Sequence, residues 1–215
     1  MLEIKRLILG PVQTNTYLVA DSANRQAAVI DPAWDGERIA VEALGLGWTI
    51  GAVWITHAHF DHFGGAAGLV NGVKAPLLVA LHPDDLSLWK SGGGWRLFGL
   101  RIDEPPAPSA WLSDRMSLSL GGEQFEVRHC PGHSPGHVIF VCEAQKTAFV
   151  GDVIFKNGIG RSDLPGGNEA RLLRSIRENI LSLPDDVRLY PGHGAQTTVG
   201  AERRANPFLV SGSLP

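Results

Sequence analysis

Short apolar runs rich in β-branched residues recur along the whole chain and are separated by Gly, Pro, Asn and Asp. Runs of this kind, bounded by turn-forming residues, predict β-strands. The expected strands are residues 2–9, 16–20, 27–30, 52–55, 76–81, 116–120, 124–129, 138–142, 148–150 and 187–190. Gly10-Pro11 supplies a turn between the first two strands, and Gly121-Gly122 supplies a hairpin turn later in the chain.

Apolar residues at helical spacing predict helices at residues 35–46, 64–70, 83–89 and 168–183. The last of these is the clearest. Asn168 caps it, Pro184 ends it, and its single apolar stripe consists of Leu172, Leu173, Ile176, Ile180 and Leu183. Many strands with interspersed helices predict an α/β fold of two sheets with helices packed outside. Because no repeat or linker divides the chain, we expect one domain over residues 1–215.

Residues 91–111 interrupt this pattern with three consecutive glycines, three aromatic residues and three prolines. Connections of this length in compact domains are often lids or binding loops. A surface segment that covers the edge of the core explains the same composition, and both interpretations remain open.

Composition narrows the class of protein. The chain has 215 residues, of which 44% are hydrophobic and 19% charged, and its formal charge is −3. This charge offers no basic field for a polyanion, so nucleic acid is not expected as a partner. The N-terminus lacks the apolar core of a signal peptide, and no run approaches the ~18 apolar residues of a membrane span. We therefore expect a cytoplasmic protein with no membrane contact, in which Cys130 and Cys142 are buried thiols. The sequence does not indicate an oligomeric state.

The segment from Thr56 to His62 carries the strongest chemical signal. It follows an apolar strand and contains His57, His59, Asp61 and His62. In an extended segment, residues two apart point to the same side, so His57 and His59 can approach one ion together. The chain then turns, and the last two side chains can face a neighbouring ion. The spacing therefore indicates a metal site.

Three further polar residues also follow predicted strands, each beside a glycine: His133, Asp152 and His193. Neighbouring strand ends meet at one edge of a sheet, so we expect all seven side chains to converge there. Glycine permits the tight backbone that such loops need.

These seven positions resemble the metal-binding pattern of the metallo-β-lactamase superfamily. Within it, the chain is most similar to the glyoxalase II branch, especially its short single-domain bacterial members of the YcbL type. The matching segments are residues 130–137, 151–155, 160–163 and 202–209. The resemblance implies a four-layer αββα sandwich and a site for two divalent ions.

By this resemblance the seven residues divide between the two ions. One ion would be held by His57, His59 and His133, the other by Asp61, His62 and His193, with Asp152 bridging them. Nitrogen and oxygen ligands without a thiolate suit zinc, iron or manganese, and zinc is our first expectation.

The ligand set predicts a metal-dependent hydrolase with Asp61 and Asp152 as its catalytic residues. Two divalent ions roughly 3.5–4 Å apart lower the pKa of a bridging water to near neutrality, which gives an attacking hydroxide. The expected substrate is a small thioester, S-lactoylglutathione or a related acyl-glutathione. A leaving thiol with a pKa of about 8.5 departs as thiolate without a general acid, whereas an amide would need a proton donor.

Departures from the glyoxalase II pattern weaken the expectation of glutathione specificity. The full-length enzymes hold glutathione with a Lys and a Tyr shortly after the bridging Asp, where this chain offers Arg161 and no phenol. They also carry a C-terminal helical extension, while this sequence stops at Pro215. Arg161 is expected either to grip a substrate carboxylate or to pair with Asp163.

Other functions are known for the same fold. A persulfide dioxygenase retains the seven positions but uses one iron held by two His and an Asp. A nuclease is disfavoured by the charge balance, and a non-enzymatic binding module would hold metal without turnover.

Four other residues lie near the pattern. Asp31 either orients a ligand imidazole or only forms the turn before Pro32. His137 either borders the site or is a packed histidine, and the packed role is our first expectation. His82 and His129 are expected to be structural or surface histidines.

Overall fold

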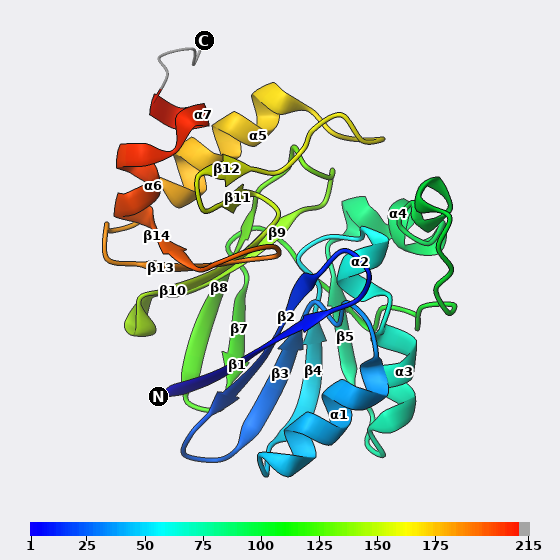
Figure 1. Cartoon of the computed structure of the whole chain (residues 1–215). Helices are drawn as coiled ribbons and strands as arrows, with labels where there is room; N and C mark the ends of the chain where they lie inside the picture. The colour runs from blue at the N-terminus through cyan, green and yellow to red at the C-terminus, as the bar shows by residue number, and fades with distance from the viewer. Residues whose placement is uncertain (211–215) are drawn as a thin grey trace.

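The computed structural model describes residues 1–210 and contains two six-stranded sheets packed face to face (Figure 1). The strands of the first sheet, in spatial order, are β1 (Leu2–Leu9), β2 (Thr14–Asp21), β3 (Gln26–Ile30), β4 (Thr49–Trp54), β5 (Leu78–Leu81) and β6 (Ala110–Trp111). β1, β2 and β3 pair antiparallel, and β3 to β6 run parallel. The parallel strands carry their C-terminal ends to one edge, where the polar loops begin.

The second sheet is mainly antiparallel. Its strands, in spatial order, are β14 (Thr197–Thr198), β13 (Arg188–Pro191), β10 (Thr147–Gly151), β9 (Val138–Cys142), β8 (Glu123–His129) and β7 (Ser117–Leu120). Only β10 and β13 pair parallel. A small ribbon of β11 (Ile154–Phe155) and β12 (Gly158–Ile159) follows β10.

Helices cover the outer face of each sheet (Figure 1). The α-helices are α1 (Gly36–Gly45), α2 (Phe60–Phe63), α3 (Ala66–Gly72), α4 (Leu86–Lys90), α5 (Glu169–Ser175), α6 (Val199–Ala205) and α7 (Pro207–Val210). Short 3-10 turns lie at Pro83–Asp85, Trp95–Phe98 and Glu143–Gln145, and a π-helical turn spans Ile176–Ile180.

Three apolar layers hold these elements together. Ile39 of α1 and Leu69 of α3 pack against the first sheet, and Leu172 and Ile176 pack against the second. The layer between the sheets joins side chains such as Trp54 to partners from the other sheet. The expected four-layer αββα sandwich is therefore confirmed. That the chain forms one domain stays a prediction, and its expected boundary at residue 215 lies outside the described residues.

The predicted strands and helices are present, with some corrections. The helix expected at 168–183 is capped by Asn168, whose side chain accepts from the Arg171 N–H at 2.9 Å, but it widens into the π-helical turn. This wide turn brings Asn179 against β8, where it donates to the His129 carbonyl at 3.2 Å. Elements β6, β11, β12, β14, α6 and α7 were not predicted. The four strands among them have two residues each, which leaves no periodicity to detect.

Residues 91–111 lie partly beside the cavity and partly over the sheet edge, and a role as a lid or binding loop stays a prediction. Gly93, Gly94, Leu97 and Phe98 line the pocket described below. The rest covers the sheet edge, where the Trp89 indole donates to the Pro106 carbonyl at 3.0 Å and β6 pairs with β5.

The two cysteines are free and buried, as expected. Within residues 1–210, no helix has the length and apolar character needed to cross a membrane.

Candidate metal centre

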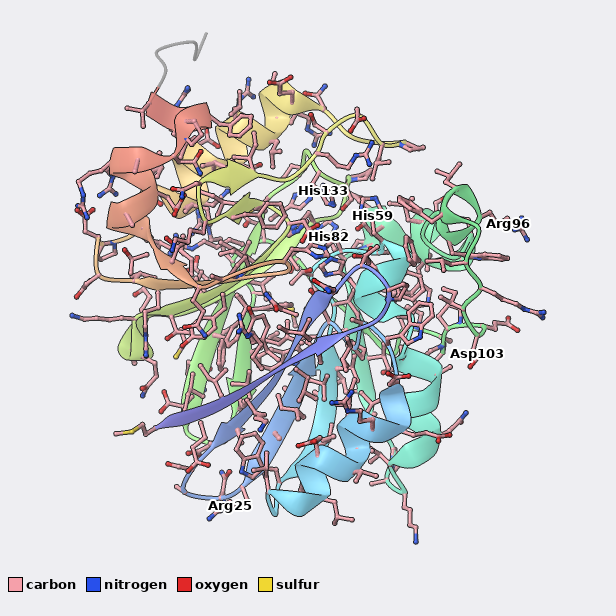
Figure 2. The ribbon with its side chains drawn as sticks, in the orientation of Figure 1. Arg25, His59, His82, Arg96, Asp103 and His133 are labelled. Atoms are coloured by element: carbon pink, nitrogen blue, oxygen red, sulfur yellow. The ribbon has the colours of Figure 1, made fainter. Side chains whose placement is uncertain are left out.

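Three imidazoles form the first cluster: His57, His59 and His133. Their ligand nitrogens all lie within 4.8 Å of one another. His133 Nε2 lies 2.8 Å from His59 Nδ1 and 3.1 Å from His57 Nε2. Figure 2 shows His59 and His133 side by side, although their loops belong to different sheets.

The second cluster consists of Asp61, His62 and His193. Asp61 Oδ2 lies 3.5 Å from His62 Nε2 and 3.2 Å from His193 Nε2. The Thr14 hydroxyl, from the start of β2, donates to the same carboxylate oxygen at 2.9 Å. Asp61 and His62 lie in α2, which begins directly after the extended residue His59.

The Asp152 carboxylate lies between the two clusters. Its Oδ1 is 3.4 Å from His62 Nε2, and its Oδ2 is 3.7 Å from His133 Nε2 and 3.5 Å from His193 Nε2. Gly192 permits this approach, because a Cβ there would lie 2.2 Å from Asp152 Oδ1. The structure thus brings all seven side chains together, while their binding of metal stays a prediction.

Hydrogen bonds around the clusters fix the tautomers of three imidazoles. The His133 Nδ1 faces the Arg161 carbonyl at 2.7 Å, and the His62 Nδ1 faces Asp31 Oδ2 at 2.9 Å. The Thr56 hydroxyl donates to Asp31 at 2.6 Å, so its oxygen is left to accept from the His57 Nδ1, 3.0 Å away. Each of these rings therefore carries a proton on Nδ1 and directs its Nε2 inward, toward the clusters.

This arrangement fits divalent cations. His57 Nε2 and His133 Nε2 face each other with lone pairs at hydrogen-bond distance and no proton between them. Among the described residues, His62 Nε2 and Asp152 Oδ1 are buried without a hydrogen-bond partner. Buried polar atoms are normally paired, and a cation at each cluster would satisfy these.

Burial and the clustered charges shift the pKa values of the ligands. Burial lowers the pKa of His59 to about 3, and burial also lowers the pKa of His57 and of His133. Burial opposes the charged form of His62, but Asp152, Asp61 and Asp31 outweigh it and raise its pKa well above the usual value. The second cluster is thus surrounded by more negative charge than the first, and it favours a positive charge at His62 Nε2.

Burial disfavours the charged form of the two candidate catalytic carboxylates, yet neighbouring imidazoles keep both ionised. His62 and His193 lower the pKa of Asp61 to about 2 despite its burial. The same two rings, with His133, hold the pKa of Asp152 far below its ordinary range. Both carboxylates are therefore available as anionic ligands at neutral pH.

The surrounding residues adopt definite roles. Asp31 contacts a ligand imidazole, which is the first of its two expected roles. His137 is fully buried, as expected, and stacks on His57 with ring centroids 4.6 Å apart. His82 and His129 stack on each other, with ring centroids 4.2 Å apart and an angle of 12° between the ring planes, and Asp84 lies within reach of this pair. Their nearly parallel rings do not point their lone pairs at one common position, which supports a structural role.

Asp85 is a supporting residue that sequence reasoning missed. It is fully buried and accepts hydrogen bonds from the Ala58 N–H, the Ser134 hydroxyl and the Gly136 N–H at 2.9, 2.7 and 2.6 Å. It thereby ties the loop of His57 and His59 to the loop of His133. Asp85 follows strand β5, so the strand-end rule that found the ligands also applies to it.

A cavity of about 380 Å³ opens over the two clusters and is walled mainly by apolar side chains. Arg161 also lines it, and its guanidinium forms two 2.8 Å hydrogen bonds with Asp163. This pairing is one of the two roles expected for Arg161. Its contact with a substrate is untested.

Known proteins resemble this chain over nearly its whole length. It is 37% identical over 202 residues to the hydroxyacylglutathione hydrolase GloC of Haemophilus influenzae, covering 94% of this chain and 95% of that protein. The crystal structure of BLEG-1, a B3 metallo-beta-lactamase, matches with a TM-score of 0.90 and 36% identity over 97% of this chain and 100% of the other. TTHA1623, solved in a di-iron-bound form, matches with a TM-score of 0.87 and 41% identity over 95% and 100%.

A more distant match is ETHE1 from Myxococcus xanthus, with a TM-score of 0.81 and 25% identity over 99% of this chain and 86% of that one. The family model described as the metallo-beta-lactamase superfamily matches residues 9–193, a range that includes all seven clustered side chains. The chain therefore belongs to the metallo-beta-lactamase superfamily.

Proposed function

We propose that this protein is a metal-dependent thioester hydrolase and that S-lactoylglutathione, or a related acyl-glutathione, is among its substrates. The observation that carries the proposal is the position of Asp152, with one carboxylate oxygen toward His62 and the other toward His133 and His193. A carboxylate placed in this way suits two ions, one in each cluster. Zinc is the first candidate, and the di-iron form of TTHA1623 keeps iron open.

The chain's own residues define what the site does. Divalent ions bound by the two clusters would supply an activated water and polarise a carbonyl oxygen. His193 and the cavity walls admit the substrate, since the His193 side chain is 29% exposed while those of His57 and His62 are buried. Asp31, Thr56 and the Arg161 carbonyl hold the ligand rings in one orientation.

A thioester suits this site better than an amide. Among the described residues, those that line the cavity include no Lys, Tyr or Cys to protonate a leaving nitrogen, and the His and Asp side chains there are the proposed metal ligands. A thiol with a pKa of about 8.5 leaves as thiolate without such a donor. The name of the Haemophilus influenzae relative supports an acyl-glutathione substrate.

The experiment is a substrate panel assayed with zinc-, iron- and manganese-loaded protein, with the metal content counted in each sample. The panel contains S-lactoylglutathione, other acyl thioesters and a β-lactam. We expect hydrolysis of thioesters and little of the β-lactam, with S-lactoylglutathione saturating poorly. Hydrolysis of the β-lactam alone would contradict the proposal.

A persulfide dioxygenase is the second candidate, supported by the structural likeness to ETHE1. It predicts one iron per chain and oxygen uptake on glutathione persulfide. Two ions per chain without oxygen uptake would support the hydrolase.

A further inference from the structure

Apolar side chains flank the metal centre on two opposite sides. Beside the first cluster, Phe60 packs against Phe98 with ring centroids 5.0 Å apart. Beside the second, the Phe155 ring centroid lies 5.9 Å from that of His193. Further apolar wall residues come from separate segments of the chain: Val12, Leu88, Leu97, Ile159, Leu164 and Pro165. A carbonyl held over the clusters would therefore have apolar surface within reach of its substituents.

The rim of this cavity keeps large apolar side chains in contact with water. Leu97 is 70% exposed and Phe98 is 46% exposed, although both lie next to the site. Exposed apolar side chains gathered around a cavity are typical of a surface that binds an apolar ligand.

Glycines fix this rim to the ligand loop. Gly92, Gly93 and Gly94 all have left-handed backbone, with φ of +79°, +63° and +83°. The Phe60 N–H donates to the Gly93 carbonyl at 3.1 Å, and a Cβ on Gly93 would lie 2.3 Å from the Phe60 nitrogen. Because Phe60 directly follows His59, the rim is held in place relative to the first cluster.

Within residues 1–210, the side chains that line the cavity offer no unpaired cation to a charged substrate. Arg161 is the only Lys or Arg among these lining residues, and both of its hydrogen bonds go to Asp163. Arg96 lies at the outer edge of the 91–111 segment, away from His59 and His133 (Figure 2), and its guanidinium lies over the Trp95 ring at 5.1 Å. A carboxylate at the far end of an acyl group, held at the rim and away from the two clusters, would therefore lose water without gaining an ion pair from a side chain.

From these observations we infer that the preferred substrates are thioesters with an apolar, uncharged acyl group, aliphatic or aromatic, and that glutathione is held only weakly. This inference rests on the proposed thioester hydrolysis and names the substrate class within it. The acyl group lies against the Phe98 and Leu97 rim, while the clusters act on the carbonyl.

The test uses zinc-loaded full-length protein and thioesters of one small neutral thiol, N-acetylcysteamine. The acyl groups are acetyl, butanoyl, hexanoyl, phenylacetyl and glutaryl, with S-lactoylglutathione for comparison. We expect kcat/KM to rise at least tenfold from acetyl to hexanoyl, since each buried methylene favours binding. Glutaryl, which ends in a carboxylate, should fall well below hexanoyl.

Two serine variants test whether the preference for apolar acyl groups depends on the rim of the cavity. Leu97→Ser should reduce the ratio of hexanoyl to acetyl kcat/KM at least threefold. Leu44→Ser changes a comparably exposed leucine, 79% exposed on α1, and should leave that ratio as in the wild type.

The outcomes separate this inference from the proposed function. A flat series, or S-lactoylglutathione hydrolysed with a higher kcat/KM than the hexanoyl thioester, would overturn the apolar preference and leave the hydrolase intact. No hydrolysis of any thioester by protein that retains two ions would overturn the proposed function and the inference with it.

Discussion

The Asp85 carboxylate accepts a hydrogen bond from the backbone N–H of Ala58 at 2.9 Å, and Ala58 separates His57 from His59. The same carboxylate binds the Ser134 hydroxyl and the Gly136 N–H in the loop that follows His133. One buried side chain thus sets the spacing between the two loops that build the first cluster.

Asp85→Asn should weaken metal binding at the first cluster. The amide keeps the size of the carboxylate but replaces one acceptor oxygen with an N–H donor, which faces donors on both loops. Loss of such a supporting contact typically costs about 10–100-fold in metal affinity. Zinc affinity measured by competition with a chelator checks this expectation. Asp84→Asn, an exposed neighbour, is the matched control, and equal affinities for the two variants would contradict the assigned role of Asp85.

A pair of glycines tests whether the 91–111 segment is fixed against the ligand loop. Gly93 and Gly99 have nearly the same φ, +63° and +65°, so an added Cβ strains the backbone similarly at both. Only at Gly93 does the Cβ also meet backbone atoms of the ligand loop, at 2.3 and 2.6 Å, whereas Gly99 has none within 4 Å. Gly93→Ala should therefore lower the free energy of unfolding by ~1–3 kcal/mol more than Gly99→Ala does, which lowers the Tm further. It should also lower thioester turnover. Equal melting curves for the two variants would mean that residues 91–111 shift away from the added Cβ without a loss of stability, and so are not fixed against the ligand loop.

Acid should destabilise the chelated protein, that is, protein from which a chelator has removed the metal. Burial lowers the pKa of His59 to about 3 and lowers the pKa values of His57 and His137 well below normal. In the unfolded chain these imidazoles take up protons near pH 6.5, so unfolding binds protons and stability falls as the pH drops below that value. Each contributes on the order of 1 kcal/mol per pH unit in this range.

His62 and His193 act in the opposite sense and in a different window. Carboxylates overcome the effect of burial and raise their pKa values, so their stabilisation is complete below pH 6.5 and is lost as the pH rises through the folded pKa. The Tm of the chelated protein, measured from pH 5 to 8, should consequently decline on the acid side of pH 6.5. A Tm that is constant or rises between pH 6.5 and 5 would contradict this account.

The convergence of the seven side chains could be predicted from the sequence because each follows an apolar strand beside a turn. His133, Asp152 and His193 are far apart in the chain, yet parallel strand ends bring them to one edge. The same rule applied to Asp31 and would have reached Asp85, since strand β5 ends four residues before it, at Leu81.

Other features depend on contacts that leave no periodic pattern. The Arg161 carbonyl that fixes the His133 tautomer is a backbone atom, which any residue would supply. The π-helical turn depends on where Asn179 meets β8, and the apolar stripe reads the same with or without it. The split of the 91–111 segment into rim and edge cover depends on glycine dihedral angles that residue types alone do not give.

The central claim is that seven side chains hold two ions that Asp152 joins. The most direct measurement counts zinc per chain in wild-type protein and in Asp152→Asn after gel filtration. Thioester turnover is recorded on the same samples. The control is Asp103→Asn, because Asp103 is exposed and lies far from His59 (Figure 2). The account predicts two ions per chain in the wild type and the control. In Asp152→Asn it predicts about one ion or fewer, with turnover reduced at least a hundredfold. Wild-type protein that retains no zinc, or chelated protein that hydrolyses thioesters as fast as the loaded form, would contradict it.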